Sequence, residues 1–184
     1  MDFLLKNFIK TAPSFVKDLI NQEILIPAKT IKQKFPQAKE INVTEKGIKV
    51  TVNEKIIIPM EITFTLFLKD IDLKNSKIRI LMKDLNLQAP KTYTRLEMLI
   101  LIFATSFFHL ILQTILKSKL PTPLKEDIKV YYEDEIIIEY DFSNVKELQI
   151  LNKPLPIINK PISHILKVTQ ITHSKEGIKL KFEI

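Results

Sequence analysis

The chain has 184 residues, of which 46% are hydrophobic and 27% charged, so it can form one domain with a sizeable core and is not disordered. It has no cysteine, which excludes disulfides and cysteine-based metal sites or nucleophiles, and its two glycines are too few for a P-loop or a G-x-G-x-x-G site. The formal net charge of +7 favours anionic partners.

Residues 1–12 predict a short amphipathic helix, with Phe3 and Phe8 opposite Lys6 and Lys10. They do not fit a signal peptide, because the start lacks positive charge and Lys6 interrupts the apolar run. If the N-terminus is native, a cytoplasmic or peripheral membrane protein is expected. The segment either packs on the fold or anchors it in a membrane interface.

A second helix is predicted to begin at Ser14, to be interrupted or kinked at Pro27, and to end with a turn or two before Pro36. A basic cluster follows, made of Lys29, Lys32, Lys34 and Lys39. We expect it to be either a solvated face or a contact with anionic lipid headgroups.

Alternation of apolar and polar residues predicts strands on both sides of a central apolar stretch. They are expected at 48–52, 55–58, 61–68, 77–87, 128–132, 135–140, 165–172 and 177–184. Asn53-Glu54 is predicted to turn the first of these into the second. Gly47 and Gly177 follow Glu-Lys and Lys-Glu and precede Ile, which predicts two hairpin turns with positive φ. Short connections throughout predict an antiparallel sheet.

The central stretch is a predicted helix over 95–117, because 98–116 contains no charge, proline or glycine. Arg95, Ser106, His109 and Gln113 fall on one narrow stripe of this helix, and Met, Leu, Ile and Phe occupy most of the rest. Two interpretations compete. The helix crosses a membrane, or the protein itself covers it on most sides.

Internal similarity favours the covered helix. Residues 48–58 match 128–138 at six of eleven positions, and 65–84 match 165–184 more weakly. We therefore predict a single domain, 1–184, built from two copies of a helix followed by about four strands, at about 14–87 and 94–184, with an insertion at 143–162. A membrane crossing would separate the copies and leave each small sheet with an unburied apolar face.

No catalytic, metal or cofactor site is predicted. His109 has no histidine, cysteine or acidic residue three or four positions away, and Asp70 and Asp72 are expected to be turn carboxylates. Nucleic acid is disfavoured as a partner, because the chain has two arginines and its phenylalanines occupy apolar positions. A two-repeat clamp on DNA is suggested by charge and duplication alone.

In its order of elements, the region 14–184 resembles the tubular lipid-binding superfamily, which includes the bactericidal/permeability-increasing-like and synaptotagmin-like mitochondrial-lipid-binding modules. The resemblance implies an α+β fold in which a strongly curved antiparallel sheet wraps a long apolar helix and leaves a groove for acyl chains. It implies a non-catalytic binder or carrier of a lipid or other apolar ligand. The family has no diagnostic motif, so it assigns no individual residue.

The expected groove lies between the long helix and the facing strands. Its predicted ligand-binding residues are Phe64, Leu66, Ile80, Met82, Phe103, Phe107, Phe108, Ile111 and Leu112. If these residues form a filled core instead, we expect a structural or interaction module that docks to a membrane surface or a protein partner. A homodimer formed through sheet edges is a further hypothesis.

Overall fold

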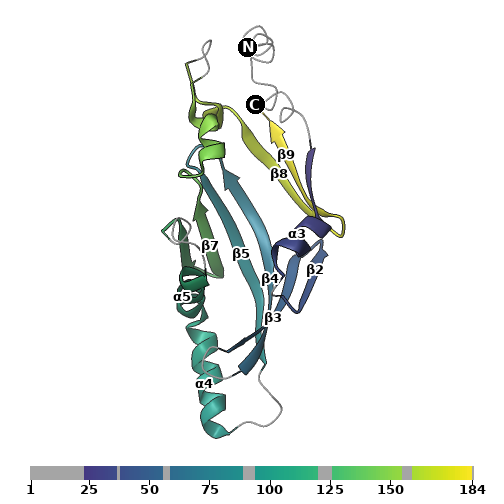
Figure 1. Cartoon of the computed structure of the whole chain (residues 1–184), viewed down its shortest axis with the longest axis vertical. Coiled ribbons are helices and arrows are strands. Elements are labelled where there is room, and N and C mark those ends of the chain that lie inside the picture. The colour runs from purple at the N-terminus through teal and green to yellow at the C-terminus, as the bar shows by residue number, and fades with distance from the viewer. Residues whose placement is uncertain are drawn as a thin grey trace.

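The computed structural model (Figure 1) describes residues 23–36, 38–55, 59–88, 94–119, 126–154 and 159–183. The predicted amphipathic segment 1–12 and the helix start at Ser14 lie outside these residues and stay predictions.

Most strands belong to one antiparallel six-stranded sheet. Its order is β2 (Glu40–Thr44), β3 (Gly47–Lys55), β4 (Pro59–Asp72), β5 (Lys77–Gln88), β7 (Ile136–Asp141) and β6 (Ile128–Tyr132). The prediction of antiparallel pairing is confirmed. The turn predicted at Asn53-Glu54 is wrong, because β3 continues through both residues and pairs Lys55 with Pro59 of β4.

A second, three-stranded antiparallel sheet joins the two ends of the described chain. Its order is β1 (Glu23–Pro27), β9 (Gly177–Glu183) and β8 (Lys167–Ser174), and α3 (Ala28–Lys34) follows β1. The helix predicted to run up to Pro27 is therefore wrong over β1, where Ile26 pairs with Ile178. A partner so distant in sequence leaves no local signal. The short helical turn predicted before Pro36 is confirmed by α3.

The two glycines form equivalent turns, as predicted. Gly47 begins β3 with φ 122° and Gly177 begins β9 with φ 146°. The hydroxyls of Thr44 and Ser174 donate to the Gly47 and Gly177 carbonyls at 3.1 and 3.3 Å. Each glycine also touches a neighbouring strand, since a Cβ on Gly177 would lie 2.0 Å from the Ile26 carbonyl oxygen. The β2–β3 and β8–β9 hairpins thus share one construction.

Two apolar clusters hold the fold together. The first lies where the small sheet packs on the large one, and the second lies between the large sheet and α5 (Phe108–Lys119). The first includes Val50, Leu68, Ile162, Leu166, Leu180 and Phe182, and the second Met60, Ile62, Met82, Phe108, Leu112, Val130 and Ile136. Helix α4 (Arg95–Ser106) contributes no residue to either cluster.

The predicted α+β fold with a curved sheet wrapped around a long helix is wrong. The chain is mostly β, and the apolar stretch forms two helices that meet at a 79° bend rather than one long helix. Helix α5 packs on the sheet through Phe108 and Leu112, while α4 extends towards one end of the molecule (Figure 1). The division into two helix-plus-strand repeats stays a prediction. The segment 143–162 contains the short 3-10 helix Lys146–Asn152, and another begins at Ile162 (Ile162–His164).

Candidate functional site

The bend between α4 and α5 is the first feature of the candidate site. Helix α4 begins with a capping box, in which Thr94 Oγ1 accepts from the Glu97 amide and the Glu97 carboxylate accepts from the Thr94 amide at 2.7 Å. The bonds from Thr94 hold the pKa of the Glu97 carboxyl below its ordinary value. The helix ends at Phe107, whose backbone leaves the helical region (φ −110°, ψ 19°), and α5 starts at the next residue.

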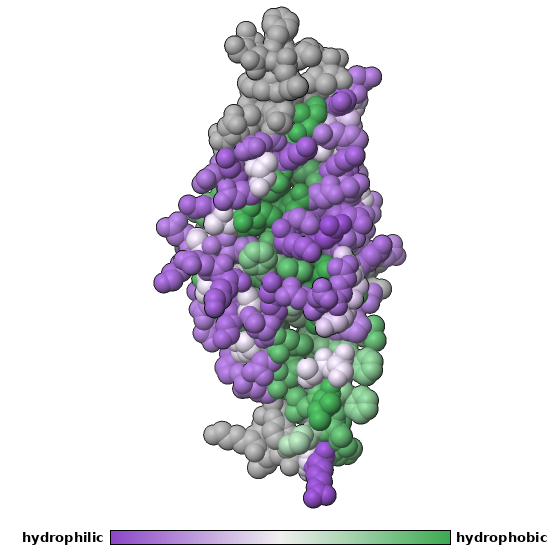
Figure 2. Space-filling view, turned by 180° about the vertical axis from the view of Figure 1, so that it is seen from behind, coloured by the Kyte–Doolittle hydropathy of each residue, from purple (hydrophilic) through white to green (hydrophobic). Residues whose placement is uncertain are grey.

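Large apolar side chains around this bend are exposed. Seven of them have exposed fractions between 49% and 67%, and we call them the α4 apolar surface: Leu96, Met98, Leu99, Ile102, Phe103, Phe107 and Leu110. Ala104 is the one buried residue of α4. Figure 2 shows hydrophobic side chains gathered at the lower end of the molecule, where Figure 1 places α4. Contiguous apolar surface of this kind marks a site of interaction.

Three hydroxyl groups near the α4 apolar surface donate hydrogen bonds to their own helices. The hydroxyls of Thr105, Ser106 and Thr114 each donate to the carbonyl four residues earlier, at 2.8 to 3.0 Å. Side chains that bond back to their own helix leave no hydroxyl in need of water. The surface is therefore suited to an environment without water.

Helix α5 anchors the bend to the large sheet. Phe108 is 2% exposed and Leu112 is 9% exposed, both in the second cluster. One side of α5 lies on β6, where the rings of His109 and Tyr132 are 6.1 Å apart between centroids. The anchored α5 fixes the direction in which α4 extends.

The structure separates the nine residues predicted to line a groove. Met82, Phe108 and Leu112 are buried in the second cluster, Phe64, Leu66 and Ile80 are partly buried strand residues, and Ile111 is half-buried on α5. Phe103 and Phe107 are exposed and belong to the α4 apolar surface. Strand and helix residues therefore meet in a packed cluster around α5, and the exposed members lie beyond it.

Of the four lysines predicted to contact lipid headgroups, one forms an ion pair within the protein. Lys29 and Lys32 are exposed on α3, whereas Lys39 forms an ion pair with Glu61 of β4 that raises the pKa of the Lys39 ammonium. The side chain of Lys34 lies outside the described structure. Two of the four lysines thus remain available for an anionic surface.

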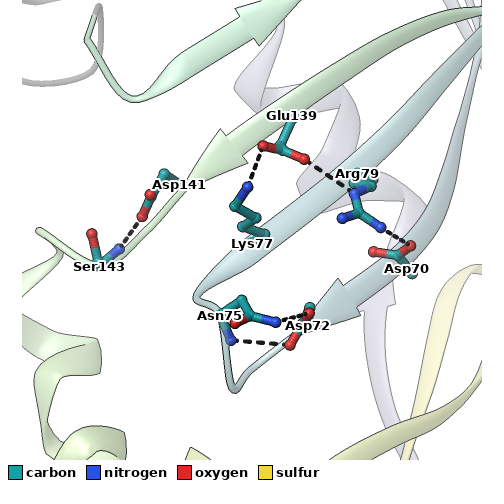
Figure 3. Close-up of polar contacts among 8 residues, drawn as sticks. All are labelled: Asp70, Asp72, Asn75, Lys77, Arg79, Glu139, Asp141 and Ser143. Carbon is teal, nitrogen blue, oxygen red and sulfur yellow. Dashed lines mark hydrogen bonds and ion pairs between the residues drawn. The ribbon is translucent and has the colours of Figure 1, made fainter. Parts of the chain in front are cut away.

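Charged residues on β4, β5 and β7 form a structural network (Figure 3). Glu139 is buried and accepts from Lys77 at 2.7 Å and from Arg79 at 3.1 Å, and Arg79 also pairs with Asp70. The bond from Lys77, followed by the one from Arg79, holds the pKa of the Glu139 carboxyl below its ordinary value. Asp72, predicted to be a turn carboxylate, accepts from the amide and side chain of Asn75.

A cleft between β4 and β8 was not predicted. It consists of two adjoining cavities of about 390 and 160 Å³, both lined by Asp70, Ile71 and Val168. The floor of the larger cavity includes Leu73 and Leu166. The alternating pattern predicts this strand only to residue 68, whereas β4 continues to Asp72 and its last residues line the cleft.

In the described ranges, no single helix is long and apolar enough to cross a membrane, although α4 and the first turns of α5 reach that length and composition together across their bend. The same ranges contain no group of three or more histidine or acidic residues placed to hold a metal ion.

No protein-family model, curated protein or solved structure matches this chain. The resemblance to the tubular lipid-binding superfamily therefore stays a prediction.

Proposed function

We propose that the protein is a non-catalytic module that docks to a lipid surface by inserting α4. The observation that carries the proposal is the α4 apolar surface, on which seven large apolar side chains are about half exposed or more. Complete burial of one such side chain contributes about 1.5–3 kcal/mol, so covering the remaining exposed area of seven contributes about 6–12 kcal/mol before the entropic costs of association.

Three features favour lipid over a protein partner. At 100° per residue, the exposed apolar side chains of α4 cover an arc of about 160°, which a fluid medium can surround more fully than one rigid partner. The hydroxyls in this region bond to the helix itself. From 98 to 114 the chain contains no charged residue, and a charge at membrane depth would cost several kcal/mol.

The depth of insertion follows from helix length. Helix α4 has 12 residues, which at about 1.5 Å each give about 18 Å, against about 30 Å for the hydrocarbon core of a bilayer. The bend at Phe107 and the buried Phe108 then hold the sheet outside the bilayer. Because Arg95 and Glu97 at the start of α4 must stay among the headgroups, we propose that α4 lies along the interface of one leaflet rather than end-on.

The proposal is tested by flotation of the purified full chain with vesicles of phosphatidylcholine, alone and mixed with phosphatidylserine. We expect the protein to float with both, and more strongly with the anionic mixture, because Arg95 and the exposed lysines Lys29 and Lys32 add electrostatic attraction. A protein that stays at the bottom of the gradient with both vesicle types would refute lipid docking. Capture of α4 by a protein partner would then be the better hypothesis.

A further inference from the structure

The cleft between β4 and β8 is bounded by the edges of two strands rather than by their faces. A cavity beside a sheet face is lined by alternate residues, because successive side chains point to opposite faces. The smaller cavity is instead lined by the consecutive residues 67–71 of β4 and 168–171 of β8. The larger cavity continues along 70–74 and 166–168. Backbone of both strands therefore borders the cleft along its length.

The strand edges that border the cleft have no strand partner in the described structure. On the β3 side, pairing of β4 ends at Leu66, so the rest of β4 to Asp72 is unpaired there. Strand β8 is the last strand of its sheet and pairs with β9 alone. One backbone group is satisfied by a side chain, since the Leu68 amide donates to His173 Nε2 at 3.2 Å. Free backbone groups at a sheet edge are a template for another strand.

The cleft is larger at one end than at the other. Its smaller end adjoins His173, whose buried ring stacks on Phe67 at 4.3 Å between centroids. Its larger end, near Leu73 and Ser163, holds the cavity of about 390 Å³. An extended chain can therefore lie along the cleft from the larger cavity towards His173.

The side chains around the cleft define the chemistry of its occupant. Ile71, Leu73, Leu166 and Val168 supply an apolar floor. Lys74 and Lys167 are exposed at the rim and have no acidic partner in the described ranges. A fitting ligand combines apolar side chains for the floor with an acidic group for the lysines.

We propose that the cleft between β4 and β8 binds an extended acidic peptide segment of a partner protein, which adds as a strand to one or both edges. Two facing rows of backbone groups are complementary to a peptide, whereas a fatty acyl chain would use the apolar floor and leave those groups unpaired. The site is separate from the α4 apolar surface, so it does not depend on lipid docking.

The test starts from a phage-displayed library of random heptapeptides, selected on the immobilised full-length protein. We expect enrichment of sequences that alternate apolar and polar residues and carry Glu or Asp. The double variant Lys74→Glu/Lys167→Glu should bind the selected peptides about tenfold more weakly or worse. The matched control Lys49→Glu/Lys129→Glu, which reverses exposed lysines on β3 and β6, should bind them as the natural chain does.

Two further measurements identify the binding mode. N-methylation of alternate backbone amides of a selected peptide removes the donors of one peptide edge. It should abolish binding in one register if the peptide pairs with one strand, and in both registers if it pairs with both strands. Hydrogen exchange should slow in 67–72 and 167–171 when the peptide is added. The proposal is overturned if no peptide is enriched, if selected peptides tolerate N-methylation in both registers, or if oleate alone slows exchange at these strands and displaces the peptides.

Discussion

Removing two side chains from the α4 apolar surface should weaken lipid docking without unfolding the protein. The double variant Leu99→Ser/Phe103→Ser removes side chains that are 54% and 64% exposed. If burial of a whole side chain contributes about 1.5–3 kcal/mol, the exposed parts of these two contribute about 2–3.5 kcal/mol in lipid. The vesicle partition coefficient should therefore fall about 30- to 300-fold. The free energy of unfolding should change by less than about 1 kcal/mol, since neither side chain is in a buried cluster.

The assay is vesicle partitioning measured by flotation, with urea denaturation in parallel to check folding. Leu25→Thr is the matched control, because Leu25 is also an exposed leucine, 41% exposed, but lies on β1 of the small sheet. Its partition coefficient should stay within about twofold of the natural value. An unchanged coefficient in the double variant, or an equal fall in Leu25→Thr, would refute insertion through α4.

Other predictions concern the fold that carries the site. Phe108→Ala should destabilise the protein by about 3–5 kcal/mol in urea denaturation, because Phe108 is 2% exposed in the second cluster, and a loss under about 1 kcal/mol would mean that α5 is not anchored. Gly177→Ala should cost at least about 2 kcal/mol, since its φ is 146° and its Cβ would meet a carbonyl of β1; an unchanged melting temperature would contradict this contact. The pKa of Glu139 is lowered in the folded protein, so the stability that this carboxylate contributes is complete above pH 4.5 and is lost as pH falls through the folded pKa. Glu139→Gln should therefore flatten the decline of the unfolding free energy below pH 4.5. An equally steep decline in the variant would show that other carboxylates cause the loss of stability in acid. Burial lowers the pKa of His173, so the unfolding free energy should fall as pH drops below 6.5. If a His173→Phe variant shows the same dependence of unfolding free energy on pH, this histidine is not the cause.

Local patterns predicted the elements whose partners lie close in sequence. Alternation found β5 and most of β4, and the two glycine turns were found because positive φ leaves glycine as the favoured residue. Strand β1 was missed because its pairing partner is at the other end of the chain, and its sequence Glu-Ile-Leu-Ile-Pro is too short to separate strand from helix by period.

The bend at Phe107 could not be read from the sequence. The stretch contains no proline or glycine there, and every residue near it is compatible with a helix. What ends α4 is packing, because α5 places Phe108 and Leu112 on the sheet while Ala104 is the one buried residue of α4. Periodicity identified these residues as apolar but could not tell which would be buried. The predicted groove residues were for that reason divided between a filled cluster and an exposed surface.

The pairing of β1 with β9 has a consequence for synthesis of the protein on the ribosome. Ile26 cannot pair with Ile178 until that residue has been synthesised, some 150 residues later. At about 5–20 residues per second, this delay is about 8–30 s. During that time the first cluster lacks its Leu180 and Phe182 side chains, so the other members of the cluster are less buried. A ribosome stalled before Gly177 should therefore hold a chain that is sensitive to protease and binds chaperones, and release of the last strand should end both.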